Sequence, residues 1–140
     1  MLADVGANRR LDCDGSVVAI PDYLSDREAA TLPCAALTAW TALVVEGGLT
    51  AGDTVLVQGS GGVSLFALQT ARMLGARVIA LSSSDAKLER MRELGAEAGV
   101  NYRTLPQWGK RVRELAGGDG VDHVVDVGGA RTLAESLRAV

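Results

Sequence analysis

The sequence is short of the residues on which disulfide-rich and metal-built domains depend. Its 140 residues include two cysteines, Cys13 and Cys34, and a single histidine, His123. The two cysteines do not form a CxxC pair, so a structural zinc site lacks ligands and a disulfide scaffold is not expected. A chain of this length can instead bury a hydrophobic core without cross-links.

An excess of basic charge and long apolar runs are also lacking. The formal net charge is −3, so the chain has no electrostatic case for binding nucleic acid or an acidic membrane surface. The apolar runs are too short to span a bilayer, and the mixed residues after Met1 do not form a signal peptide. We therefore expect a cytoplasmic protein with no nucleic-acid partner and no membrane partner.

From about residue 50, short apolar runs alternate with helical patterns. The runs have the character of strands that are covered on both faces, and they comprise residues 54–58, 77–81, 98–101 and 121–127. Helices are predicted over residues 63–74 and 84–94, and after two capping boxes, Thr104 with Gln107 and Thr132 with Glu135. Strands that alternate with helices predict an α/β fold with a parallel sheet and right-handed crossovers.

The region before the first strand has a different pattern. Ser25 and Glu28 form a third capping box, which opens a short helix that Pro33 should interrupt. A second helix is predicted from about residue 35 to residue 46, where Gly47-Gly48 ends it. Residues 1–24 are expected to be the remnant of a preceding catalytic or substrate domain, and residues 25–140 an incomplete dinucleotide-binding domain.

The sharpest local signal is the sequence Gly59-Ser60-Gly61-Gly62-Val63-Ser64, which follows a predicted strand and opens a predicted helix. This context is the one that a dinucleotide-binding fingerprint requires. Gly59 would allow the tight turn, Gly61 would let the backbone approach a pyrophosphate, and the helix N-terminus would hold the phosphates. The third position of the fingerprint is Ser64 rather than glycine. The alternative is a tight turn that binds something else or nothing.

The end of the second strand bears on which dinucleotide is bound. NAD-binding domains usually place a carboxylate there to bind the ribose 2′-hydroxyl, whereas this strand ends in Leu81-Ser82-Ser83-Ser84, with Lys87 a turn further on. Hydroxyl groups and an ammonium favour a 2′-phosphate, so the pattern predicts NADP(H), with NAD as the second choice. Two observations count against this: the serines could simply cap a helix, and Asp85 lies nearby.

Several motifs, in the same order, resemble those of the medium-chain dehydrogenase/reductase superfamily, and most of all its zinc-type alcohol dehydrogenase-like and quinone oxidoreductase-like members. The resemblance extends over most of the chain. The segments that carry it are Ala29–Trp40, Gly47–Leu49, Val57–Ser64, Asn101–Arg103 and Val127–Gly129.

The resemblance implies a Rossmann-type doubly wound parallel sheet, here apparently truncated to about four strands in the order 3-2-1-4. It also implies hydride transfer between NAD(P)(H) and a small molecule, namely a carbonyl or alcohol, an enone or a quinone. Members of the superfamily are considerably longer, so we expect a fragment that is inactive alone. The residues expected to bind the cofactor are Thr38, Gly59, Ser60, Gly61, Gly62, Val63, Ser82, Ser83, Lys87, Tyr102, Val127 and Gly128.

No catalytic residue can be nominated, and no zinc is expected. Zinc-dependent members of the superfamily carry a zinc ligand at the position of Cys34, but this chain lacks the other ligands, so Cys34 is expected to be a small packed residue. Trp40 and Trp108 are interpreted as packing residues and His123 as an ordinary strand residue. Two other functions stay open: a non-catalytic nucleotide-binding module that acts as a redox sensor or subunit, and a methyltransferase that binds an adenosyl cofactor. A homo-oligomer is also left open.

Overall fold

The computed structural model describes residues 18–140, and the chain divides into two compact units, Met1–Leu32 and Pro33–Val140. In the first unit, helix α2 (Asp26–Ala29) begins at a capping box: the Ser25 N–H donates to Glu28 Oε2 at 2.9 Å, and the Glu28 N–H donates to Ser25 Oγ at 3.4 Å. This capping box was predicted and is confirmed. Residues 1–17, most of the expected remnant, lie outside the described residues.

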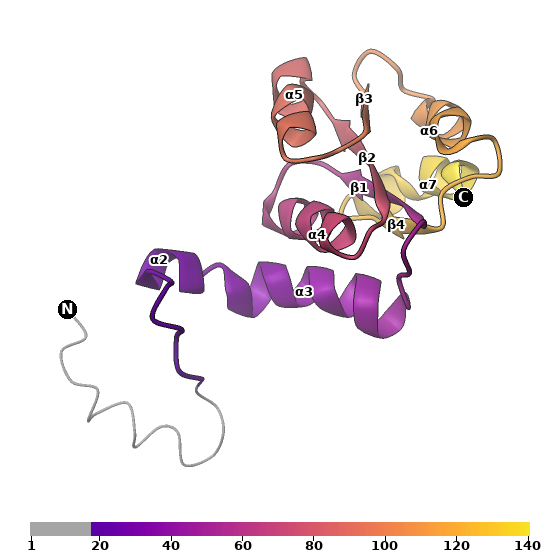
Figure 1. The fold of residues 1–140 in the computed structure, drawn as a ribbon. Helices are drawn as coiled ribbons and strands as arrows, with labels where there is room; N and C mark the ends of the chain where they lie inside the picture. Colours follow the sequence, from indigo (N-terminus) through magenta and orange to yellow (C-terminus); the bar gives the residue numbers. More distant parts are fainter. Residues whose placement is uncertain (1–17) are drawn as a thin grey trace. The chain divides into compact units, whose positions relative to one another are not determined.

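The second unit is built on a parallel sheet of four strands. The order in the sheet is β3-β2-β1-β4, as predicted (Figure 1). In the central strand, Val57 pairs with Ala80 on one side and with Val125 on the other. The strands are β1 (Thr54–Gln58), β2 (Arg77–Ser82), β3 (Ala98–Asn101) and β4 (His123–Val125).

Helices cover both faces of this sheet (Figure 1). Helices α4 (Gly62–Met73) and α5 (Asp85–Glu93), together with α3 (Leu37–Trp40), bury one apolar cluster against the sheet. Helices α6 (Trp108–Ala116) and α7 (Leu133–Ala139) bury a second cluster on the opposite face. Because side chains alternate along a strand, neighbouring residues of β2 enter different clusters: Ala80 the first and Leu81 the second.

The helix before β1 is longer than expected. Helical turns of π type flank α3: η2 (Leu32–Ala36) precedes it and η3 (Thr41–Glu46) follows it. The helical segment therefore begins before the predicted residue 35, and it ends before Gly47-Gly48, as predicted. Residues Asp26–Glu46, with a hydropathy of 1.4, are long and apolar enough to cross a membrane by length and composition alone, contrary to the expectation of short runs only. One such helix is weak evidence, because it passes a test of length and composition only. Of its apolar window 11% is buried, and Ala39 and Leu43 lie in the first cluster.

Two predicted capping boxes are wrong. Helix α6 begins at Trp108, after Gln107, and the hydroxyl of Thr104 donates instead to the carbonyl of Asn101 at 3.1 Å. Thr132 does precede α7, but its hydroxyl donates to Asp126 and caps nothing. In both cases the loop offers the hydroxyl an acceptor outside the helix, which competes with capping.

The fourth strand is shorter than the predicted 121–127. The N–H of Val121 donates to the Ala139 carbonyl at 2.8 Å, and Asp126 turns its carboxylate to the following loop. Both ends of the apolar run therefore find partners outside the sheet, and only His123–Val125 form the ladder.

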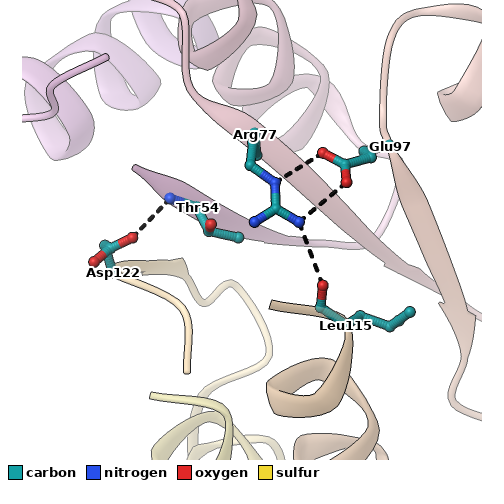
Figure 2. A network of polar contacts seen from close by, with 5 residues as sticks. All are labelled: Thr54, Arg77, Glu97, Leu115 and Asp122. Carbon is teal, nitrogen blue, oxygen red and sulfur yellow. Dashed lines mark hydrogen bonds and ion pairs between the residues drawn. The ribbon is translucent and has the colours of Figure 1, made fainter. Parts of the chain in front are cut away.

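Polar contacts connect the amino ends of the strands (Figure 2). The glycine loop follows the carboxyl end of β1, at the opposite end of the strands. Arg77 binds both carboxylate oxygens of Glu97, at 2.9 and 3.0 Å, and reaches the carbonyl of Leu115. The N–H of Thr54 donates to Asp122 at 2.7 Å, which ties β1 to the start of β4. These contacts leave the carboxyl ends of the strands free for a site.

Candidate functional site

The glycine loop forms a tight turn between β1 and α4. Gly59 adopts the left-handed conformation (φ 79°), which favours glycine, and its N–H donates to the carbonyl of Leu81 at 2.6 Å. Gly61 then occupies the N-cap of α4 in an extended conformation, without a side chain that could cap the helix. The first amides of this twelve-residue helix are thus left for another partner.

Ser64, at the third position of the fingerprint, supports this turn. It is buried, and its hydroxyl donates to the carbonyl of Gln58 at 2.5 Å, which joins the first turn of α4 to the end of β1. Glycine at this position normally allows close packing of helix and strand. Here a small side chain keeps the packing close and adds a hydrogen bond.

The space in front of the loop is open. A Cβ atom added to Gly59 or to Gly61 would meet no other atom within 4 Å, whereas one added to Gly62 would lie 3.1 Å from the Cβ of Ala35. Bare backbone that faces open space at a helix N-terminus is suited to an anionic group such as a pyrophosphate. The loop therefore fits the phosphates of a dinucleotide.

A cavity of about 450 Å³ adjoins the loop at the carboxyl ends of the strands. Its volume falls within the range of small-molecule sites. Apolar side chains line most of it, and Arg131 and Tyr102 add polar groups. The lining residues are Gln58, Gly59, Leu81, Tyr102, Pro106, Trp108, Val127, Gly128, Arg131 and Thr132.

The residues at the tip of β2 do not all face this cavity. Ser82 is only 2% exposed, and strand alternation places its side chain on the α4–α5 face, away from Leu81 and the cavity. Ser83 is half-buried and Lys87 is exposed on α5. Asp85 accepts a hydrogen bond from Asn101 Nδ2 at 2.9 Å, so its carboxylate is engaged with the end of β3. Ser84 precedes α5 but makes no side-chain capping bond.

Asp126 organises the loop after β4. Its carboxylate accepts hydrogen bonds from the N–H groups of Gly128 and Gly129, at 2.8 and 3.0 Å, and from the hydroxyls of Thr132 and Ser136, both at 2.7 Å. Burial opposes ionisation, but these four donors outweigh it and lower the pKa of Asp126 to about 2. An ionised carboxylate thus fixes the wall of the cavity that Gly128 and Thr132 form.

The predicted cofactor residues fall into two groups. Some line the cavity: Gly59, Tyr102, Val127 and Gly128. The others are absent from its lining: Thr38, Ser60, Gly61, Gly62, Val63, Ser82, Ser83 and Lys87. In this second group, the residues of the glycine loop continue from Gly59 along the open face of the turn, whereas Thr38 is exposed on α3.

Three polar residues of the cavity lining were not predicted as site residues: Gln58, Arg131 and Thr132. Arg131 lies on a 3-10 turn, η4 (Gly129–Arg131), where no periodic pattern would single it out. Gln58 could have been found, because a polar residue that ends an otherwise apolar buried strand needs a hydrogen-bond partner. Trp108, interpreted as a packing residue, is buried and also lines the cavity.

Three residues outside the cavity differ from expectation. Cys34 is exposed rather than packed, because it lies in η2, none of whose residues is buried. Trp40 also keeps 42% of its surface exposed. His123 is on β4, as expected, and its Nε2 lies 3.1 Å from Asp53 Oδ2. Within residues 18–140, no three His, Cys, Asp or Glu side chains are grouped to hold a metal ion.

A parallel α/β sheet with a glycine turn and an open cavity at its carboxyl edge defines a Rossmann-type nucleotide-binding fold. The sequence profile described as zinc-binding dehydrogenase matches residues 62–140. The chain belongs to this family of zinc-binding dehydrogenases, within the superfamily that its motifs resembled.

Individual relatives agree with this assignment. A zinc-type alcohol dehydrogenase-like protein of Schizosaccharomyces pombe is 48% identical over 124 residues, which are 87% of this chain and 36% of that protein. A solved NAD-dependent alcohol dehydrogenase superposes with a TM-score of 0.82 at 46% identity, covering 88% of this chain and 36% of the other. A mycobacterial protein in complex with NADPH gives 0.81 at 38% identity, covering 88% and 38%. The chain thus spans little more than a third of each relative.

Proposed function

We propose that this chain binds NADP(H) for a medium-chain oxidoreductase that transfers hydride between the cofactor and a small carbonyl, alcohol, enone or quinone. The glycine loop would hold the pyrophosphate, and the cavity of about 450 Å³ beside it would hold the adenosine half. Trp108 and Leu81 offer apolar surface for the base. The chemistry belongs to the cofactor, and the residues of this chain bind and orient it.

One observation favours the phosphorylated cofactor over NAD(H). Among the described residues that line the cavity, none is acidic and Arg131 carries the one formal positive charge. A carboxylate would repel a 2′-phosphate, whereas a guanidinium can bind it. Lys87 and Ser83, at the tip of β2, can add to this preference. The solved relatives include one described as NAD-dependent and one in complex with NADPH, so they support a nicotinamide cofactor of either kind.

Membership of the dehydrogenase family argues against the adenosyl-cofactor methyltransferase that the sequence left open. The non-catalytic nucleotide-binding module remains the second candidate, because it would use the same loop and cavity. Cofactor binding by this chain is compatible with either function. Hydride transfer is the property that distinguishes the oxidoreductase from the non-catalytic module.

The binding test titrates the chain with NADPH and with NADH and follows tryptophan fluorescence, which comes from Trp108 in the cavity lining and from Trp40. We expect saturable binding of both cofactors, with NADPH bound roughly tenfold more tightly, because one charge-assisted contact contributes about 1.5–3 kcal/mol. Equal or tighter binding of NADH would overturn the preference for NADP(H). An absence of saturable binding by either cofactor would overturn the whole proposal.

Two substitutions make the test specific to the site. Gly61→Ala adds a methyl group to an extended residue with open space around it, so the fold should persist while the methyl obstructs the phosphates. Ser83→Asp places a carboxylate at the tip of β2 and should shift the preference toward NADH. Ser83 is chosen over Ser82 because Ser82 is buried, where a new charge would unfold the chain.

A further inference from the structure

A chain of hydrogen bonds connects the two walls of the cavity. Gln58, the last residue of β1, donates from Nε2 to Ser136 Oγ at 2.7 Å, and Ser136 Oγ in turn donates to Asp126 Oδ2 at 2.7 Å. Gln58 directly precedes the glycine loop, whereas Asp126 holds the loop after β4. The strands that precede these two loops, β1 and β4, pair directly over three residues of each.

The bridge is buried and has little redundancy. Gln58 and Ser136 are 3% and 5% exposed, and Gln58 Oε1 is a buried atom without a hydrogen-bond partner among the described residues. The amide of Gln58 is therefore held by its nitrogen alone. Ser136 makes this contact from α7, and it is not among the residues that line the cavity.

We infer that Ser136 is a positioning residue for the nucleotide: through Gln58 and Asp126 it sets the distance between the glycine loop and the loop after β4. The inference rests on the proposed function, since it concerns the same site. Nucleotide affinity should then depend on a hydroxyl that touches no ligand, because a cavity wall that shifts loses contacts with the adenosine half.

The stability of the chain would also fall if Ser136 were replaced, so the test must separate affinity from stability. Ser136→Ala leaves the Gln58 amide wholly unpaired, which is costly when buried. The double variant Gln58→Met/Ser136→Ala replaces both partners of the Gln58–Ser136 bond with apolar groups, which can be nearly neutral for that bond, although Asp126 still loses the Ser136 donor. Gln58→Met alone breaks the same bridge from its other end and leaves Ser136 bonded to Asp126. Thr70→Val removes another nearly buried hydroxyl, on α4 and outside the cavity lining, and is the matched control.

The experiment measures the urea midpoint of each variant of the chain and its affinity for adenosine 2′,5′-bisphosphate by calorimetry. We expect Ser136→Ala to weaken binding roughly tenfold and Thr70→Val to leave it within twofold. When Ser136→Ala is added to Gln58→Met it should weaken binding by no more than about threefold, because the bridge is already broken in that background. Equal losses from Ser136→Ala in both backgrounds, or no loss when Gln58 is present, would overturn the positioning role. Where Ser136→Ala alone fails to fold, a double variant that binds at least fivefold more weakly than Gln58→Met would overturn it. If the unaltered chain binds no nucleotide, the proposed function fails and this inference fails with it.

Discussion

The N–H of Gly109 donates to Glu135 Oε2 at 2.8 Å, which joins α6 to α7. A Cβ on Gly109 would lie 2.8 Å from the Cβ of Arg138 and closer still to the carbonyl oxygen of Glu135. Both neighbours belong to α7, so only glycine permits this approach. The packing of α7 matters to the site, because the turn before it supplies Thr132 and Arg131.

The first prediction concerns this contact. Gly109→Ala should lower the free energy of unfolding by about 1–3 kcal/mol, because the added methyl forces the helices apart. Urea denaturation followed by circular dichroism measures the change. Gly61→Ala serves as the control, since its methyl enters open space and should leave the midpoint nearly unchanged. Equal midpoints for the two variants would show that α6 and α7 separate without cost.

The second prediction concerns the turn at the start of α4. Ser64→Ala removes the hydrogen bond to the Gln58 carbonyl and should cost about 1 kcal/mol of stability, the usual net value for such a bond. Ser64→Gly, which restores the third glycine of the fingerprint, should cost at least as much, because it also loses the hydroxyl and adds freedom to the helix. A Ser64→Gly variant more stable than the natural chain would contradict the supporting role of the serine.

Much of this fold was predictable because its signals are local. The runs at 54–58 and 98–101 match the observed strands, since each run is apolar and bounded by turn residues. What failed depended on tertiary partners. Thr132 resembles a helix cap in sequence, yet its hydroxyl donates a hydrogen bond to the carboxylate of Asp126.

The candidate site was predictable in part for the same reason. The glycine loop is a contiguous motif, so its sequence alone indicated a strand-to-helix turn. Arg131 and Gln58 come together only when β1 and β4 pair, and no short-range pattern encodes that approach. The burial of Ser82 was not evident from the sequence, because the face of the sheet to which a residue belongs depends on strand register.

The third prediction concerns acid stability. The pKa of Asp126 is about 2 in the folded chain, against an ordinary 3.8. Folding therefore favours the ionised form, so this stabilisation is present above pH 4–5 and is lost as the pH falls from about 4 toward 2. Asp126→Asn should be less stable at pH 7, and its stability should fall less between pH 5 and pH 2 than that of the natural chain.

Thermal unfolding at a series of pH values measures this difference. Asp119→Asn, which removes an exposed carboxylate from the α6–β4 loop, is the control and should follow the natural chain. Parallel stability curves for Asp126→Asn and the natural chain between pH 5 and pH 2 would mean that Asp126 has no role in acid unfolding.

The fourth prediction is self-association. One edge of β4 is unpaired in the described sheet, and apolar side chains lie exposed after it, on Val127, Leu133 and Leu137. An unpaired edge beside apolar surface pairs readily with other chains. Light scattering at increasing concentration should give a mass above that of the monomer. Leu137→Glu, at a position 68% exposed, should lower this mass without loss of fold. A monomeric natural chain at high concentration would contradict the prediction.

The last prediction distinguishes what Arg131 contacts in the bound nucleotide. If its guanidinium binds a 2′-phosphate, Arg131→Ala should weaken NADPH about tenfold or more and leave NADH nearly unchanged, because only NADPH carries the phosphate. Arg131→Lys keeps the positive charge and should retain part of the preference, although it loses the planar fork that binds phosphate in two places. If the guanidinium instead stacks on the base, Arg131→Ala weakens both cofactors by the same factor, since both carry adenine. Calorimetric titration of the three proteins with both cofactors separates these cases. An equal loss for NADPH and NADH would remove Arg131 from cofactor selection and leave Lys87 as the cation that the preference requires.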